Sequence, residues 1–343
     1  TAAATDLTAL DGKTSVNVGA TAVTTITGTQ AQVVAINVGT ITTSGNYAVT
    51  LSDTSLSAAA IKTVNAQNRT GAIDISSVTT ITSSTAADVL EIVNNTNSTF
   101  TTAANYAVTL SGTSSAADVN TIVNDTTGIV TATVSSDTAA NLNSALVNAS
   151  STDALTLTLT DTALASADDL IALDGKTSVA VNATSVTSVT DTYADINTLY
   201  GLSGISGLGN EAVTISDETS AVNINGILSK TSGVVTATVT SDTAASLNSA
   251  LTNTTGNDAL TLTVTGTAAA TDLTALDGKT SVNVNAASIS LLTGTIAQVQ
   301  AAYTANTAGT ITGLGDEAVT VTDVTLSSTD LNSLDLKTSG TIT

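Results

Sequence analysis

The 343-residue sequence contains no cysteine, histidine, methionine, proline or tryptophan. Without cysteine and histidine the chain has no ligands for a Cys/His zinc site, no imidazole base for a Ser-His-Asp triad and no thiol nucleophile. It also has no disulfide bonds to hold a fold together. The commonest forms of metal and nucleophilic chemistry are therefore excluded from the outset.

Basic and aromatic residues are scarce as well. Seven Lys and Arg stand against 28 Asp and Glu, for a formal charge of −21, and aromatics make up 2% of the chain. A nucleic-acid surface needs a Lys/Arg face, and base or sugar stacking needs aromatic platforms. No run of about 18 apolar residues occurs. We therefore expect neither nucleic-acid binding nor membrane insertion.

What the chain does have is a large content of small and β-branched residues. Threonine accounts for 73 of the 343 positions, and hydrophobic residues make up 42%. Disordered chains lack that much apolar surface, so a folded chain is expected. Without an initiator Met or a basic, signal-like start, the sequence is expected to be an excerpt or mature segment of a longer protein.

Long internal repeats dominate the sequence. The stretch TAAATDLTALDGKTSVNV at 1–18 recurs unchanged at 267–284, and GIVTATVSSDTAANLNSAL from Gly128 returns with few changes from Gly233. These offsets predict a super-repeat of about 105 residues within a single continuous domain, 1–343. Its predicted divisions are a partial repeat at 1–104, super-repeats at 105–209 and 210–315, and a partial repeat at 316–343.

A smaller unit lies inside the super-repeat. The stretch Val130–Val134 alternates apolar residues with threonine, as a half-buried strand does, and Ala116, Val119 and Ile122 have helical spacing. Helix ends are also marked: Asp137 and Asp242 are expected N-caps. Strands are expected to begin near Ala107, Val130, Leu155, Val179 and Ala212, and Gly12, Gly175 and Gly278 are expected to follow helices at C′.

Two architectures fit parallel strands joined by short helices. A doubly wound sheet needs strands that are apolar on both faces, whereas every other strand residue here is Thr or Ser. Near-identical repeats favour a linear array instead. We therefore predict a repeat β/α solenoid with parallel strands, short helices and about 13 coils of 23–34 residues.

Acidic residues at the predicted strand ends allow two interpretations. Stacked coils would bring some of them into register, where carboxylates could bind calcium, the only cofactor that the sequence suggests. The alternative is that these residues cap helices. The candidate calcium ligands are Asp53, Asp137, Asp161, Asp217, Asp242 and Asp323.

No catalytic constellation is visible. Glu211 and Glu317 occupy equivalent repeat positions, which favours a structural role over a glycosidase pair of unlike carboxyl groups. The lysines of the three LDGKT segments, Lys13, Lys176 and Lys279, are accounted for by helix C-terminal ends. We expect the chain not to be an enzyme.

Runs such as DLTALDGKTSVNVNA, TAADVLEIV and ITGLGDEAVTVTD resemble the Thr/Ala/Asp-rich tandem repeats of very large bacterial cell-surface and S-layer-like proteins, notably cyanobacterial ones. The resemblance covers essentially the whole chain and implies an extracellular, structural or adhesive role.

The resulting expectation is a structural, self-assembling component of an extracellular filament, sheath or surface layer. Its expected partners are further copies of itself and cell-surface polysaccharide. The alternative is an adhesin stalk or an ice-binding module that uses outward threonine rows, such as Thr131 with Thr133 and Thr236 with Thr238.

Overall fold

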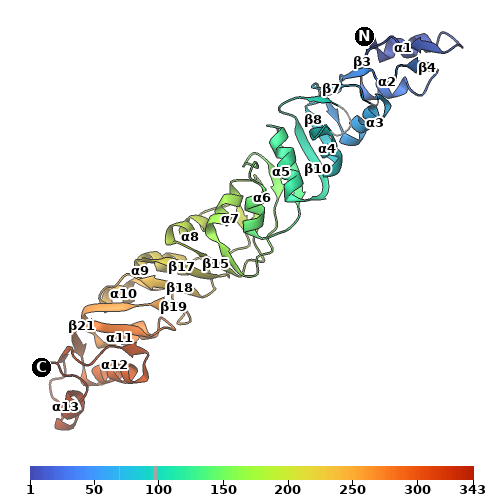
Figure 1. Ribbon diagram of the computed structural model, residues 1–343. Helices are drawn as coiled ribbons and strands as arrows, with labels where there is room; N and C mark the ends of the chain where they lie inside the picture. The colour runs from blue at the N-terminus through green and yellow to red at the C-terminus, as the bar shows by residue number, and fades with distance from the viewer. Residues whose placement is uncertain (69, 96–98) are drawn as a thin grey trace. The chain divides into compact units, whose positions relative to one another are not determined.

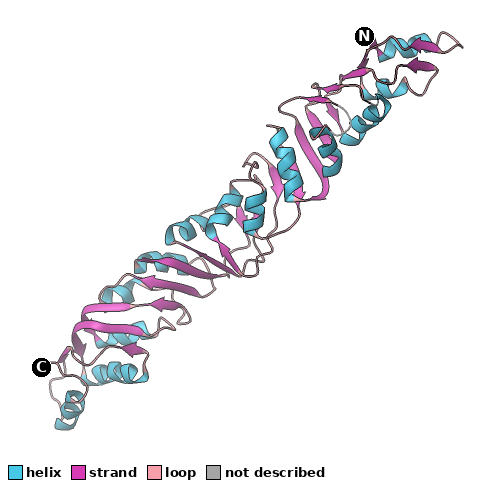
Figure 2. Cartoon of the chain, in the orientation of Figure 1, coloured by secondary structure: helices cyan, strands magenta, loops and turns pink. Residues whose placement is uncertain are grey.

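The computed structural model describes residues 1–68, 70–95 and 99–343. Within them, short strands and helices alternate along the chain (Figures 1 and 2), and the strand pairs run parallel. The predicted alternation of parallel strands with short helices is confirmed.

The helices of the described residues are α1 (Ala4–Asp11), α2 (Gln30–Ala35), α3 (Ala58–Asn68), α4 (Ala86–Val93), α5 (Ala116–Asp125), α6 (Ala139–Ala145), α7 (Ala167–Asp174), α8 (Tyr193–Leu199), α9 (Ala221–Leu228), α10 (Ala244–Ala250), α11 (Ala270–Asp277), α12 (Ile296–Ala308) and α13 (Ser328–Asp335).

The strands up to residue 160 are β1 (Ala2–Ala3), β2 (Val18–Ala20), β3 (Thr25–Gly28), β4 (Ile41–Thr43), β5 (Ala48–Leu51), β6 (Ser55–Leu56), β7 (Ile73–Ile75), β8 (Thr80–Ser84), β9 (Phe100–Thr102), β10 (Ala107–Ser114), β11 (Val130–Val134) and β12 (Ala154–Thr156). The later strands are β13 (Leu164–Ser166), β14 (Val181–Asn182), β15 (Ser188–Asp191), β16 (Ile205–Ser206), β17 (Ala212–Thr219), β18 (Val235–Val239), β19 (Ala259–Thr261), β20 (Thr263–Ala269), β21 (Val284–Gly294), β22 (Ile311–Thr312) and β23 (Ala318–Val321).

The chain divides into two compact parts, residues 1–160 with 172–182 and residues 161–171 with 183–343. The first part holds the sheets β1-β3-β5-β7-β9, β12-β11-β10-β8-β6 and β2-β4. The second holds β13-β15-β17-β18-β19 and a sheet in which β21 pairs with β20, β22 and β23. The pairings thus form separate sheets rather than one continuous ladder.

The longer strands bury one face and leave the other more exposed. In β11 and β18 the Val and Ala side chains are buried and the intervening Thr side chains are exposed. On the other side of the core, α5 buries Val119 and Ile122 at helical spacing. Small aliphatic side chains therefore fill the space between strands and helices, with very few aromatic rings.

The N-cap residue of α6 and of α10 is threonine, not aspartate. The prediction that Asp137 and Asp242 are N-caps is wrong, because each precedes the true N-cap, Thr138 or Thr243, whose hydroxyl accepts the N3 amide. The same hydroxyl cap begins α2, α4, α5, α8, α9, α12 and α13.

The helix ends in the LDGKT segments also differ from expectation. Gly12 and Gly278 are C-caps with φ of −67° and −76°, in the right-handed region, not left-handed residues at C′. Glycine is therefore not required there by backbone conformation. Left-handed glycine does end α12, where Gly309 has φ of 83°.

A buried threonine follows several helices and ties each one to a neighbouring strand. The Thr231 hydroxyl donates to the Glu211 carbonyl oxygen (2.5 Å) and accepts from the Gly233 amide (3.0 Å). The hydroxyl thus satisfies an acceptor just before β17 and a donor just before β18. The set consists of Thr126, Thr177, Thr231, Thr280 and Thr338, all less than 10% exposed.

At three of these positions, Thr126, Thr231 and Thr338, a glycine two residues later permits the close approach of the backbones. A Cβ on Gly233 would overlap the Glu211 carbonyl, and one on Gly128 or Gly340 would overlap the equivalent carbonyl of Tyr106 or Glu317. The helical Gly226, by contrast, has open space where its Cβ would lie.

This contrast provides a matched test of the backbone contact. Gly233→Ala should lower the free energy of unfolding by about 2 kcal/mol, because the strands must separate. Gly226→Ala should raise it by about 0.5–1 kcal/mol, because alanine is the better helix former. Urea unfolding followed by circular dichroism measures both. Equal effects of the two substitutions would contradict the close approach at Gly233.

Candidate functional site

Three of the predicted calcium ligands cap helices from the following strand–helix unit. The carboxylates of Asp53, Asp217 and Asp323 accept the first backbone amide of α2, α8 and α12, at 2.6 Å in each case. The aspartates lie 23, 24 and 27 residues after the amides that they cap. A helix N-terminus favours a carboxylate because its first amides lack intrahelical acceptors.

Asp137 and Asp242 bond instead within their own segments. The Asp137 carboxylate accepts hydrogen bonds from the Thr138 amide and the Asn141 side chain, both at 2.8 Å. The bond from Asn141 is the largest cause of the lowered pKa of Asp137. Asp242 accepts from the Thr243 amide at 2.7 Å. Asp161, the sixth candidate, is partly exposed after β12.

The structure does not gather these six aspartates into a cluster. Among the described residues, the one group of three carboxylates close enough to share a cation consists of Asp168, Asp191 and Asp195, with ligand atoms within 4.8 Å of one another. Sequence reasoning missed this group. The available signal was an aspartate at the end of β15 and others in the first turns of α7 and α8.

Hydrogen bonds already orient two members of this acidic cluster. Asp191 accepts from the Ser166 hydroxyl (2.9 Å) and the Asp168 amide (3.3 Å), and Asp195 accepts the Thr192 hydroxyl. Repulsion from Asp191, and then from Asp195, raises the pKa of the exposed Asp168. Because calcium takes six to eight oxygen ligands, three carboxylates, two of which already accept hydrogen bonds, supply only part of a coordination shell.

The most deeply buried carboxylates are not among the predicted ligands. Glu211 is fully buried; it accepts the Tyr200 hydroxyl and the amides of Gly209 (2.6 Å) and Asn210 (3.0 Å). Glu317 repeats this arrangement with Tyr303 and the amides of Gly315 and Asp316. The structural role predicted for these equivalent glutamates agrees with their contacts.

Tyrosine replaces glutamate at the same strand position in the earlier repeats. Tyr47 and Tyr106 precede an Ala-Val-Thr strand just as Glu211 and Glu317 do. The Tyr106 hydroxyl donates to Asp125 at 2.6 Å, and the Tyr47 hydroxyl accepts from the Asn37 side chain at 2.9 Å. Both versions therefore place a phenol against a polar partner between a strand and a helix.

Two further buried carboxylates, Asp153 and Asp258, bond to backbone at the start of strands. The Asp153 carboxylate accepts from the amides of Val130 and Ser150, each at 3.0 Å, and from the Ser150 hydroxyl at 3.2 Å. Asp258 makes the equivalent bonds to Val235 and Thr255.

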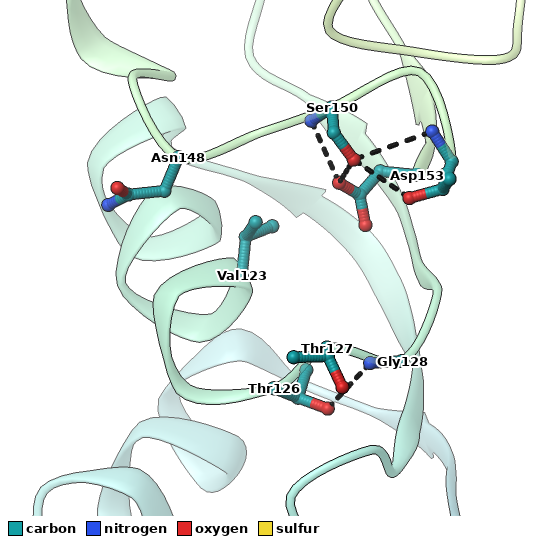
Figure 3. Close-up of a pocket in the computed structure, with 8 residues that line it drawn as sticks. Val123, Thr126, Thr127, Gly128, Asn148, Ser150 and Asp153 are labelled. Atoms are coloured by element: carbon teal, nitrogen blue, oxygen red, sulfur yellow. Dashed lines mark hydrogen bonds between the residues drawn. The ribbon is translucent and has the colours of Figure 1, made fainter.

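A hollow of about 280 Å³ lies beside Asp153 (Figure 3). Thr126, Thr127 and Gly128 line one side and Ser150 and Asp153 the other. The dashed bonds of the figure hold Asp153 to Ser150, so the carboxylate is occupied by its own loop. The described lining thus offers hydroxyl groups but no base free to take a proton.

No described helix is long and apolar enough to cross a membrane, as the lack of long apolar runs predicted. The sequence matches no protein-family model and no curated protein, and the fold matches no solved structure.

Three tyrosines that are buried or partly buried predict a loss of stability at alkaline pH. Burial, and then the adjacent carboxylate, raises the pKa of Tyr106, Tyr200 and Tyr303 above the ordinary value of about 10. The folded chain therefore retains protons that the unfolded chain releases. Its free energy of unfolding should fall as the pH rises above about 10, at about 1.4 kcal/mol per pH unit for each such tyrosine.

Urea unfolding at several values between about pH 8 and about pH 11 checks this, with phenolate absorbance recorded in parallel. Three tyrosines should ionise only as the chain unfolds. Complete ionisation of all five while the circular dichroism remains native would contradict the burial of these phenols.

The capping aspartates can be separated from calcium ligands by substitution. Asp217→Ala should lower the free energy of unfolding by about 1 kcal/mol, equally in EDTA and in calcium, because the Tyr193 amide loses its acceptor. Asp335→Ala removes the same charge from an exposed position and is the matched control. A calcium-dependent stabilisation of the parent chain that Asp217→Ala abolishes would instead identify a ligand.

Proposed function

We propose that this chain is a structural segment of an extracellular filament, sheath or surface layer, without enzymatic activity, that assembles with further copies of itself. One observation carries the proposal. The buried carboxylates that the sequence offers for chemistry, Glu211, Glu317, Asp153 and Asp258, are engaged in hydrogen bonds to neighbouring strands, helices and loops.

We further propose that the strand–helix units continue one another as a repeat β/α solenoid. Within the first compact part each of the helices α1 to α6 contacts the next, and within the second the same is true of α8 to α12 (Figure 1). Units that contact mainly their neighbours are the arrangement of a linear repeat protein. The about 105-residue sequence repeat supports the same interpretation.

Exposed edges supply the means of assembly. A parallel strand at the edge of a sheet presents unpaired amides and carbonyls, which pair readily with another chain. The resemblance to tandem repeats of bacterial surface proteins supports an extracellular location and a contact with cell-surface polysaccharide. A charge of −21 would keep the segments soluble before they assemble.

An adhesin stalk or ice-binding module is the second candidate, because the outward threonines do align. Thr190, Thr214 and Thr236 lie in register on β15, β17 and β18, and the next partner in the row is Ala259. The Thr190 hydroxyl donates to the Thr214 carbonyl at 3.2 Å, which is a bond within the sheet. A row of three threonines supports a ladder between strands more strongly than an extended ice-binding plane.

Negative-stain electron microscopy of the chain at increasing concentration tests the proposal. We expect filaments or sheets that lengthen as the concentration rises. They should persist in EDTA, because the described links between units need no metal. Polysaccharide hydrolase and lyase assays should show no turnover. Discrete particles at every concentration, together with thermal hysteresis of freezing, would overturn the proposal in favour of the second candidate.

A further inference from the structure

The hollow beside Asp153 is bordered by a loop that the chain contains twice. The loop VNASSTDAL at 147–155 corresponds to TNTTGNDAL at 252–260, 105 residues later. Both loops contain a buried aspartate, Asp153 or Asp258, whose carboxylate accepts the first amide of the preceding strand. Because the two loops share this framework, their differences show what is particular to the first one.

The main difference concerns the asparagine that follows the helix. In the second loop the Asn253 side chain donates to the Asn225 carbonyl, and the Asn225 side chain donates to the Thr252 hydroxyl, both at 3.1 Å. In the first loop Val147 replaces that threonine. The equivalent Asn148 is exposed, and its side-chain amide has no hydrogen-bond partner among the residues that the structure describes. The first loop therefore keeps a free amide beside the hollow.

The walls of the hollow add unused acceptors. An ionised carboxylate can accept about four hydrogen bonds. Asp153 receives three, from the Val130 amide and from the amide and hydroxyl of Ser150. On the other side of the hollow (Figure 3), the Thr127 hydroxyl donates to the Ala104 carbonyl at 3.2 Å, which leaves its oxygen able to accept. The hollow thus combines acceptors on both sides with the free amide of Asn148.

This combination suits a neutral ligand that carries hydroxyl groups. The described lining has one carboxylate and no basic side chain, so it repels an anion. A cation needs several free oxygen ligands, whereas both oxygens of Asp153 already accept amides. A hydroxyl group both donates and accepts. A sugar hydroxyl can therefore donate to Asp153 or Thr127 and accept from Asn148.

The size of the hollow limits the ligand to one sugar unit. Its volume of about 280 Å³ lies just below the range of about 300–1,000 Å³ that is usual for small-molecule sites. Val123 of α5 lines it (Figure 3), and the equivalent residue of α9 is Leu228. The two side chains are 8% and 7% exposed. A leucine at position 123 would add a methylene group to the wall of the hollow.

We propose that this hollow binds a single neutral sugar unit of a cell-surface polysaccharide, with Asp153 and Thr127 accepting hydrogen bonds from sugar hydroxyls and Asn148 bonding beside them. The inference rests on the proposed contact with polysaccharide and gives that contact a site. No aromatic ring is part of the described lining, so hydrogen bonds supply the affinity, and we expect a dissociation constant on the order of 10 mM. A polysaccharide that contacts many assembled chains would bind more tightly, because its later contacts form within one complex.

Nuclear magnetic resonance of the isotope-labelled full chain tests the site. The probes are methyl α-glucoside, methyl α-galactoside and methyl α-mannoside, each titrated to about 100 mM, which is roughly tenfold above the expected dissociation constant. At least one of them should shift the amide signals of residues 126–128 and 148–153 in a saturable way. The equivalent signals of residues 231–233 and 253–258 should not move.

Three substitutions locate the binding within the chain. Val123→Leu should weaken it about tenfold, because the added methylene takes up part of the space, and the fold should persist because leucine occupies the equivalent position. Asn148→Ala should weaken it about fivefold through the loss of one hydrogen bond. Asn253→Ala, at the equivalent exposed position of the second loop, is the matched control and should bind like the parent.

The outcomes separate this site from the proposed structural role. The absence of saturable shifts with all three glycosides would overturn the site, and so would parent-like binding by both Val123→Leu and Asn148→Ala. Shifts of the same amides with calcium chloride but not with a glycoside would overturn the neutral ligand. Assembly is observed by electron microscopy without sugar. Filaments without glycoside binding would therefore overturn this site alone, and glycoside binding without filaments would overturn self-assembly alone.

Discussion

The structure depends on finding hydrogen-bond partners for the backbone amides and carbonyls where a helix ends and the next strand begins. A short unit buries these polar groups within a narrow core, where an unpaired amide or carbonyl is costly. Buried threonines such as Thr231 meet the requirement with one hydroxyl that both donates and accepts. Threonine therefore serves as a strand former, a helix cap and an interior link, which accounts for its abundance.

The phenol–carboxylate pairs show that this requirement determines the kind of hydrogen bond at a junction and not which residue supplies each group. At one strand position the chain uses Tyr106 with Asp125, and at the equivalent position later it uses Glu211 with Tyr200. The ring comes from the residue before the strand in the first pair and from the end of the preceding helix in the second, and a phenol–carboxylate hydrogen bond forms in both. Repeats can thus diverge in sequence while the junction between strand and helix stays satisfied.

The sequence was sufficient to predict the elements but not the partners of their polar groups. Period-two alternation located β11 and β18, and helical spacing located α5, because these patterns follow from burial of one face. The roles of Asp53 and Asp217 could not be read from local sequence, since the amides they cap lie 23 and 24 residues earlier. The grouping of Asp168, Asp191 and Asp195 depends on the same stacking of one unit on the next.

Capping from the following unit gives synthesis of this chain a direction. The first amide of α8 bonds to Asp217, and the C-cap carbonyl of α10 bonds to Lys279. Both partners are translated after the helix end that they complete. As the chain leaves the ribosome, each of these helices lacks part of its hydrogen bonding until the following unit has been made. The end of the growing chain keeps backbone groups without partners for the next unit to pair, while the groups in the earlier units are already paired.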